Sequence, residues 1–205
     1  MFIQTEPTPS PESVKFIPDT TFVIEGAADP RAVFDFTRAV PQAYAPSGFF
    51  GKPRAPLPAR LFDLAGVARV MVAPHYVVVT KTPEADWAGL KTPILIALMD
   101  HLTAPEPAVY AVPEGGGGAS VEGMPGGDPT LATHIRAVID DYIRPDVAAH
   151  GGDIALSHVQ DGVVYLHLRG ACAGCPSLQV TLKKGVEHIL KTHIPDIVAV
   201  EAVAA

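Results

Sequence analysis

Residues 151–177 read GGDIALSHVQDGVVYLHLRGACAGCPS, and the order of patterns in this stretch decides the fold of the C-terminal part of the chain. From Asp153 onward apolar and polar residues alternate, which predicts a β-strand. Asp161-Gly162 is a two-residue hairpin signal, and the alternation resumes over 164–168. The loop at 170–177 then carries both cysteines of the chain. The sequence therefore predicts an antiparallel hairpin that leads into a loop with two thiols.

Helices are predicted on both sides of this hairpin. Before it, Asp128-Pro129 supplies an N-cap and a proline at the first helical position, and apolar residues recur at helical spacing. Pro145 interrupts that pattern, and Gly151-Gly152 ends the helix and allows the chain to reverse into the strand. A second helix starts near Pro176, and residues 197–203 form a last strand. We therefore predict an α+β domain with two helices on one face of a three-stranded sheet.

The composition changes sharply after Leu102. Residues 104–128 are rich in proline and glycine, show no helix or strand period, and include four consecutive glycines at 115–118. Such a stretch is typical of a flexible linker. It leaves an N-terminal domain at 1–103 and a C-terminal domain at 129–205, both long enough to fold independently.

The N-terminal half has the same kind of pattern. It predicts strands at 14–17, 21–25, 67–73 and 76–81, helices at about 29–40, 60–64 and 87–102, a kink at Pro93 and a loop rich in proline, glycine and aromatic residues at 41–58. The predicted fold class of the chain is therefore α+β, with two small α+β domains joined by a flexible Gly/Pro-rich linker.

Composition excludes several classes of function. The chain has 205 residues with 22 Asp plus Glu, 15 Lys plus Arg and a formal charge of −7, a balance that disfavours nucleic-acid binding. Its apolar stretches are too short to span a bilayer, two cysteines cannot staple a disulfide-rich secreted domain, and the N-terminus lacks a signal-peptide pattern. We expect a soluble intracellular protein that binds neither nucleic acid nor membrane.

Cys172 and Cys175 carry the chemical signal. Two intervening residues let both sulfurs reach one metal centre, and they also let the pair close into a disulfide. Gly170 and Gly174 permit close approach of the backbone. The loop enters a helix, whose N-terminal N–H groups and dipole favour the thiolate. The pair is therefore expected to be functional, although two structural cysteines in a turn remain the plainest alternative.

The number of ligands indicates a second chain. Structural zinc and iron–sulfur clusters usually have four protein ligands, and one chain offers two thiolates. The histidines do not pair convincingly with the cysteines and are expected to be ordinary surface or half-buried imidazoles; they include His158, His167, His188 and His193. The simplest complete site takes Cys172 and Cys175 from each of two protomers. A cluster held in this way would be shared, exposed and labile, which suits transfer.

Two other functions use the same pair of cysteines. A thioredoxin-like dithiol–disulfide oxidoreductase also places Cys-x-x-Cys between a strand and a helix, but here the parallel βαβ context and a tryptophan before the first cysteine are missing. A zinc-bridged structural dimer is the third reading. Metal content separates the three, since the oxidoreductase needs no metal and the zinc protein is colourless.

The chain resembles a known family over most of its length. The C-terminal residues are similar to the NifU-like C-terminal domain of iron–sulfur cluster scaffold and carrier proteins, and the matching text is Ile143–Pro145, His150–Ile154, Gly170–Ser177, Thr181–Gly185 and Ile194-Pro195. The N-terminal residues resemble the Nfu N-terminal domain, at Met1–Pro9, Val14–Phe16, Leu61-Phe62, Gly66-Val67, Val77–Lys81 and Asp86-Trp87.

This resemblance implies a carrier with no catalytic residues. It implies that Cys172 and Cys175 of two protomers bridge a [4Fe–4S] cluster, with a [2Fe–2S] form left open, and that the homodimer hands the cluster from upstream assembly machinery to apo iron–sulfur proteins. The implied location is the cytoplasm of a bacterium or the mitochondrial matrix of a eukaryote. Two features depart from the family: Leu178 stands where members often have serine, and the aromatic loop at 41–58 is longer than usual.

Overall fold

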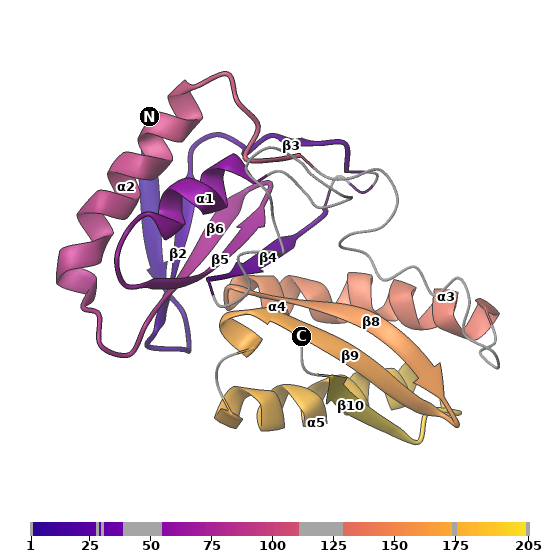
Figure 1. Cartoon of the computed structure of the whole chain (residues 1–205). Coiled ribbons are helices and arrows are strands. Elements are labelled where there is room, and N and C mark those ends of the chain that lie inside the picture. Colours follow the sequence, from indigo (N-terminus) through magenta and orange to yellow (C-terminus); the bar gives the residue numbers. More distant parts are fainter. Residues whose placement is uncertain are drawn as a thin grey trace. The chain divides into compact units, whose positions relative to one another are not determined.

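The structure is a computed structural model that describes residues 2–27, 29, 31–38, 55–110, 129–173 and 176–203. The chain divides into two compact units, residues 1–118 and 119–205, which run from indigo to magenta and from orange to yellow in Figure 1. Each unit combines helices with its own sheet. The predicted α+β fold class is therefore confirmed.

The described residues of the N-terminal unit form a five-stranded antiparallel sheet, a pair of short parallel strands and two helices. Its elements are β1 (Ile3–Pro7), β2 (Ser13–Pro18), β3 (Ile24–Glu25), β4 (Phe34–Thr37), α1 (Pro56–Phe62), β5 (Val67–Ala73), β6 (Tyr76–Lys81), α2 (Trp87–Thr103) and β7 (Val109–Tyr110). The large sheet has the order β1-β2-β6-β5-β4, and β3 pairs with β7.

Alternation along the central strands builds the core of this unit. Val70 and Val72 of β5 and Val77 and Val79 of β6 are buried in one apolar cluster, because every second side chain of a strand points to the same face. The same cluster contains apolar residues of α1 and α2, and both helices lie against the sheet in Figure 1. The predicted strands at 67–73 and 76–81 are confirmed.

The predicted helix at 29–40 is wrong. Phe34–Thr37 is strand β4, which pairs antiparallel with β5. Phe34 and Phe36 are buried, whereas Asp35 and Thr37 are only partly covered, so the segment has the period of two that a half-buried strand needs. The Asp-Pro start signal at 29–30 indicated a helix, but aromatic and threonine side chains favour a strand, and pairing with β5 decides the outcome.

Other boundaries in this unit also differ from the prediction. The strand predicted at 21–25 is reduced to Ile24–Glu25. The helix predicted at 60–64 spans Pro56–Phe62, with proline in the first turn, where a missing N–H costs nothing. Residues 56–58 therefore belong to α1 and not to the aromatic loop. The remainder of that loop from 41 to 54, which contains Tyr44, Phe49 and Phe50, lies outside the described residues.

The first residues of the predicted linker are part of the N-terminal unit. Val109–Tyr110 is strand β7, Ala108 and Val109 are fully buried, and the Ala108 N–H donates a hydrogen bond of 2.8 Å to the Val23 carbonyl. The prediction that 104–110 has no regular structure is therefore corrected, because short-strand pairing leaves no periodic pattern to detect. Residues 111–128, including the glycine run and the predicted N-cap Asp128, lie outside the described residues.

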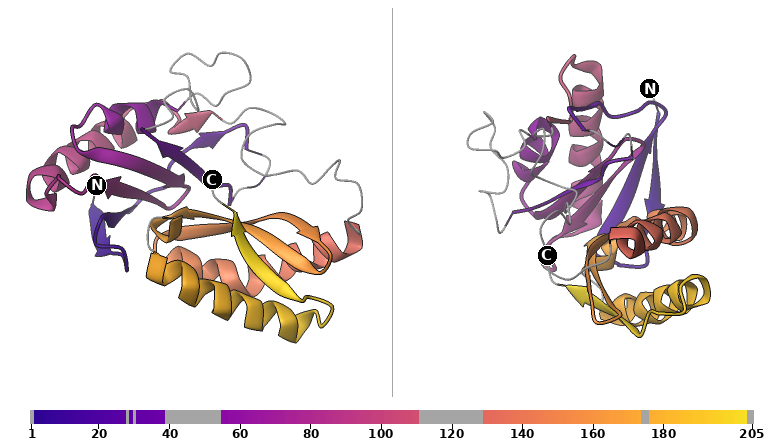
Figure 2. Two further views of the ribbon diagram at one scale, coloured as in Figure 1. Left: turned by 60° about the horizontal axis from the view of Figure 1, so that its bottom comes forward. Right: turned by 90° about the vertical axis from the view of Figure 1, so that its right-hand side faces the viewer.

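The C-terminal unit follows the predicted order of elements. It contains α3 (Pro129–Val138), a π-helical turn (Ile139–Ile143), α4 (Arg144–Ala149), β8 (Gly152–Gln160), β9 (Val163–Gly170), a 3₁₀ turn (Ala171–Ala173), α5 (Pro176–His193) and β10 (Ala199–Val203). The sheet order is β10-β9-β8, with an antiparallel β8–β9 hairpin and a parallel β9–β10 pair. Figure 2 shows α3 and α5 side by side along one face of the sheet.

Pro145 widens the first helix of this unit without ending it. Proline has no N–H to donate, and its ring clashes with the carbonyl four residues earlier. The chain forms a π-helical turn at this point, and the Arg144 N–H bonds to the Ile139 carbonyl five residues back. The helix then continues to Ala149. This turn places Arg144 near the start of β8, where it takes part in the site described below.

The longest helices are α2 with 17 residues and α5 with 18. In the described part of the chain, no helix combines the length and the apolar character that a membrane crossing requires. Both helices instead bury one face against their own sheet, as the buried residues Ile94 and Leu98 of α2 and Val186 and Leu190 of α5 indicate.

Candidate functional site

Cys172 lies in the 3₁₀ turn Ala171–Ala173, between the end of β9 and the start of α5. The residue has no exposed surface and belongs to the apolar core of the C-terminal unit. Cys175 lies outside the described residues. The predicted location of Cys172, at a strand-to-helix loop, is confirmed, and the pairing of its sulfur with that of Cys175 stays a prediction.

The paired ends of the hairpin hold this turn. Gly152, the first residue of β8, pairs with Gly170, the last residue of β9. One residue further on, the Ala171 N–H donates a hydrogen bond of 3.0 Å to the Gly151 carbonyl. The backbone that leads to Cys172 is therefore attached to β8 on both sides of the Gly152–Gly170 pair.

Gly152 leaves the space that the Cys172 thiol occupies. A Cβ placed on Gly152 would fall less than 3.0 Å from Cys172 Sγ, 3.1 Å from Cys172 Cβ and 3.2 Å from Val147 Cγ1. Gly152 does not have a positive φ, whereas Gly151 has a φ of 73°. Glycine is thus required at the two neighbouring positions for different reasons. Gly151 turns the chain out of α4, and Gly152 makes room for the sulfur.

A buried charge network lies directly beside this slot. Asp153 is 2% exposed and stands opposite Arg169 in the β8–β9 register, where opposite charges on facing residues attract. Arg169 Nη1 is 3.6 Å from one Asp153 carboxylate oxygen, and Arg144 Nε is 3.2 Å from the other. Arg144 also pairs with Asp140 at 2.7 Å and donates a hydrogen bond of 3.3 Å to the Ile154 carbonyl.

Burial raises the pKa of Asp153, and the charges of Arg144 and Arg169 oppose that rise. The Arg144 Nε–Asp153 contact is an ion pair without hydrogen-bond alignment, so the attraction is electrostatic and only weakly directional. The network joins the π-helical turn to both strands of the hairpin and so fixes the base of the Cys172 turn. Arg144 and Asp153 lie within the motifs Ile143–Pro145 and His150–Ile154, but the sequence did not indicate that they pair with each other or with Arg169. The available signal was the position of Asp153 and Arg169 at the paired ends of the predicted hairpin, since charged residues are seldom buried unless they are paired.

The histidines near this unit have other neighbours. The His158 ring stacks on the Tyr165 ring with centroids 4.2 Å apart, and the His193 ring lies 4.4 Å from that of Tyr142. Burial lowers the pKa of His167. No group of three or more His, Cys, Asp or Glu side chains suited to a metal ion occurs among the described residues, a set that does not include Cys175.

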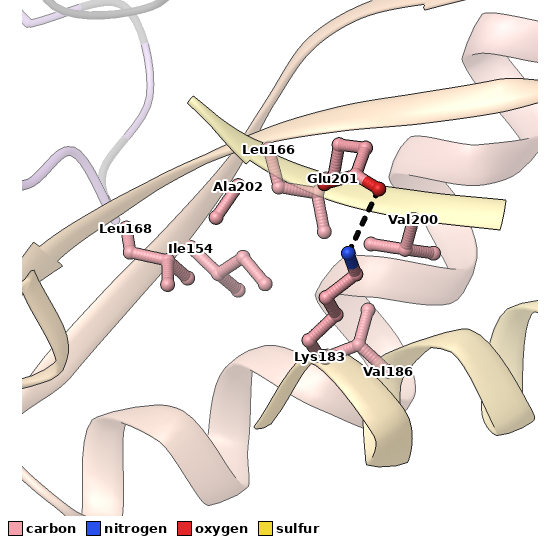
Figure 3. A pocket seen from close by; sticks show the side chains of 8 residues that line it. All are labelled: Ile154, Leu166, Leu168, Lys183, Val186, Val200, Glu201 and Ala202. Atoms are coloured by element: carbon pink, nitrogen blue, oxygen red, sulfur yellow. Dashed lines mark hydrogen bonds and ion pairs between the residues drawn. The ribbon is translucent and has the colours of Figure 1, made fainter. Parts of the chain in front are cut away.

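A shallow apolar hollow lies between α5 and the sheet (Figure 3). Its lining consists of six apolar side chains and one ion pair: Ile154, Leu166, Leu168, Val186, Val200, Ala202, Lys183 and Glu201. Lys183 Nζ lies 2.8 Å from Glu201 Oε1 across its mouth. The lining contains neither thiol nor imidazole, so the hollow offers no soft metal ligand. Lys183 is therefore engaged within the unit, whereas Lys184 is exposed.

The described geometry offers one soft ligand, the Cys172 sulfur, on a turn with a fixed base. Thiolate sulfur binds zinc and iron–sulfur clusters in preference to hard cations. The turn precedes the N-terminus of α5, and backbone N–H groups there stabilise a thiolate and bind cluster sulfurs. The arrangement can contribute part of a thiolate metal site.

Family models match both units. The model described as "NifU-like domain" matches residues 135–201, and the model described as "Scaffold protein Nfu/NifU N terminal" matches residues 3–105. The first match contains the whole β8–β9 hairpin and the turn with Cys172. The second extends to within the loop that precedes β7.

Curated relatives match along the whole chain. A human protein named "NFU1 iron-sulfur cluster scaffold homolog, mitochondrial" is 36% identical over 204 residues, which are 99% of this chain and 72% of the human protein. A Drosophila willistoni protein of the same name is 34% identical and is covered over 64% of its length, so the chain spans less than two thirds of that relative. Among solved structures, a NifU-like protein from Saccharomyces cerevisiae aligns with a TM-score of 0.42 and 16% identity, over 53% of this chain and 84% of that one.

Proposed function

This chain belongs to the Nfu/NifU family of iron–sulfur cluster scaffold proteins, and from that premise we propose that it binds a [4Fe–4S] cluster between two protomers and transfers the cluster to apo iron–sulfur proteins. Cys172 and Cys175 of each protomer are the proposed ligands. The observation that carries the proposal is the position of Cys172 in the turn that joins β9 to α5, inside the segment that the NifU-like model matches.

The dimer follows from the number of ligands. A cubane cluster takes four thiolates, and the chain has two cysteines. With Cys172 and Cys175 from each of two chains, the ligand set is complete. A cluster held at such an interface touches solvent along its rim, where an incoming thiolate of a target protein can replace the ligands one at a time.

Transfer of this kind needs no catalytic group. Each Fe–S(Cys) bond that breaks is replaced by a bond to a thiolate of the acceptor, so the oxidation state of the cluster does not have to change. The chain accordingly acts as a carrier and not as an enzyme, and the cluster is its cargo. A [2Fe–2S] cluster would use the same four thiolates, and iron content distinguishes the two.

The partners are proposed from the same chemistry. The chain receives its cluster from upstream assembly machinery and delivers it to apo-proteins that offer free thiolates, and it binds neither nucleic acid nor membrane. The N-terminal unit is proposed to contact these partners. The names of the relatives support a mitochondrial location, and the cytoplasm is the corresponding place in a bacterium.

Anaerobic reconstitution with ferrous iron and sulfide tests the proposal. We expect a brown dimer with about four irons per two chains, the stoichiometry of one cubane. The Cys172→Ser/Cys175→Ser double variant should bind no cluster and stay colourless. His158→Ala is the matched control, since its imidazole stacks on Tyr165 and should not affect iron content.

Three results would contradict the proposal in different ways. Retention of the cluster by the double variant would show that the cysteines are not its ligands. A colourless dimer that contains zinc would indicate a structural zinc site. A protein that binds no metal and reduces disulfides would indicate a dithiol–disulfide oxidoreductase.

A further inference from the structure

We propose that Gly152 forms a slot that stores the Cys172 thiol inside the core of the C-terminal unit, and that the thiol leaves this slot when it ligates iron. Gly152 is thus a positioning residue for the thiol. The movement of the thiol to a second position, where it binds iron, rests on the proposed function. The slot itself is a property of the fold and is tested without iron.

The sulfur of Cys172 is buried. Cys172 has no exposed surface and packs among the apolar residues of its unit. A cluster that two chains share lies outside the core of either chain. The sulfur therefore cannot bind such a cluster from its buried position, and the thiol must have a second position at the surface.

The slot is defined by space and not by backbone strain. A Cβ on Gly152 would overlap Cys172 Sγ and would also lie 3.2 Å from Val147 Cγ1. Because the φ of Gly152 is not positive, an alanine there can adopt the same backbone conformation. The only cost of the methyl group is its collision with the thiol and with Val147. Glycine at 152 is therefore required wherever the sulfur occupies the stored position.

The surroundings divide into a fixed base and a short segment that can move. The base consists of the paired strand ends and the Asp153 ion pairs with Arg144 and Arg169. The sulfur itself is carried by a single 3₁₀ turn, Ala171–Ala173, a conformation with poorer hydrogen bonds than an α-helix. Gly170, at a φ of 64°, precedes the turn. Motion of this turn releases the thiol while the hairpin stays intact.

The rate of thiol alkylation measures the stored position directly. The full chain with Cys175→Ser, reduced and free of metal, is treated with iodoacetamide, and modification of Cys172 is followed by mass spectrometry. We expect alkylation of the folded chain to be slower than that of the urea-unfolded chain. Gly152→Ala in the same background should raise the folded-state rate by about tenfold or more, which corresponds to about 1.4 kcal/mol lost from the stored position.

Gly185→Ala is the matched control. It makes the same substitution in α5 of the same unit, at a place where a Cβ would meet nothing within 4 Å. Its alkylation rate should equal that of the parent chain. The inference is overturned if Gly152→Ala reacts no faster than Gly185→Ala, or if folded Cys172 already reacts as fast as in urea.

A thermodynamic cycle keeps the inference testable if Gly152→Ala does not fold well. Gly152→Ala is introduced into the parent chain and into Cys172→Ala, where the sulfur is gone. We expect the substitution to destabilise the Cys172→Ala chain clearly less than the parent, because coupled residues show non-additive effects. Equal destabilisation in both chains contradicts the slot. These measurements use no iron, so failure of cluster binding in the parent chain would count against the proposed function and leave this result standing.

Discussion

The two units use buried charge for different purposes. In the N-terminal unit, charged side chains tie parts of the sheet together: Arg69 pairs with Asp35 across β4 and β5 at 3.1 Å, and Arg38 donates a hydrogen bond of 2.7 Å to the Val67 carbonyl. In the C-terminal unit, Asp153 and its two arginines lie beside the turn that carries the thiol. The same interaction joins the strands of a sheet in one unit and lies at the base of the turn that carries Cys172 in the other.

The difference has a physical reason. Burying an ion pair in a core gains little stability over apolar packing, so a charge network in the interior is best explained where position matters. The N-terminal unit has an extensive core of valine, leucine and phenylalanine, and its charged contacts join strands that already pack on this core. In the C-terminal unit, the network joins the helix at Arg144 to the two strand ends from which the turn with Cys172 leaves.

The largest effect is expected from Phe16→Ala, which tests whether the units are energetically separate. Phe16 lies on β2 and is fully buried in the N-terminal core, so loss of the ring should lower the free energy of unfolding of that unit by about 3 to 5 kcal/mol. Denaturant unfolding measures this loss, and iron content after reconstitution should be unchanged. Phe2→Ala, at a ring that is 69% exposed, is the control. Loss of the cluster in Phe16→Ala would show that the two units are not energetically separate.

A smaller effect is expected from Asp153→Asn. Removal of one partner from a buried ion pair costs about 3 to 5 kcal/mol. Arg144 keeps its pair with Asp140, and the neutral amide avoids the cost of burying a carboxylate whose pKa is raised by that burial. We therefore expect a smaller loss of roughly 1 kcal/mol. Urea unfolding followed by circular dichroism measures it. Asp161→Asn, at an exposed hairpin residue with a φ of 49° that asparagine also tolerates, should change little. Equal stability of the two variants would show that the network does not support the turn.

A dependence on pH is expected from His101. Burial, with a smaller contribution from the nearby Arg60 charge, lowers the pKa of His101. A histidine whose pKa is lower in the folded chain supports the fold above its unfolded pKa of about 6.5, and that support is lost as the pH falls toward the folded pKa. The melting temperature of the N-terminal unit should therefore fall between about pH 7.5 and about pH 5.5, and less so in His101→Leu.

His75→Leu serves as the control for this measurement, because His75 is exposed. It should keep the pH dependence of the parent chain. Asp153 in the other unit works in the opposite direction: its pKa is raised, so its contribution favours the fold as the pH falls. An identical pH dependence in His101→Leu and in the parent chain would assign the effect to other groups.

The smallest effect is expected from Lys183→Met. The Lys183–Glu201 pair is formed by partly exposed side chains, and pairs of this kind contribute about 0 to 1 kcal/mol. Methionine keeps most of the apolar stem over the hollow, so the loss in unfolding free energy should disappear in high salt. Lys184→Met, at an exposed lysine, provides the reference. A loss that persists in salt would mean that Lys183 acts through its packing.

The hairpin of the C-terminal unit and the segment 29–40 show which elements can be predicted from the sequence and which cannot. Residues 153–168 have the period of two on both sides of Asp161-Gly162, and the structure has this hairpin with the predicted turn, although a bulge between Leu156 and His158 interrupts the alternation in β8. Residues 34–37 alternate over only four positions, and a helix start signal at 29–30 outweighed them. A strand that short is decided by its pairing with β5, which is distant in the sequence, and no local pattern contains that information.

The candidate site divides in the same way. Spacing and context make Cys172 and Cys175 the proposed ligands, because metal ligation requires particular residue types at particular intervals, and this assignment stays a prediction. The burial of Cys172 and its contact with Gly152 were not predictable. They depend on the packing of α4 against the hairpin, which brings Val147, Gly152 and the thiol together from three separate elements.

The sequence by itself determined the fold class, the order of elements in the C-terminal unit, and the thiol pair with its family. These features are encoded locally, in side-chain periodicity, turn residues and motif spacing. Only the tertiary structure decided that residues 34–37 and 109–110 are strands, that Arg144, Asp153 and Arg169 form one network, and that the thiol lies in a slot over a glycine. These features arise from contacts between residues that the chain keeps far apart until it folds.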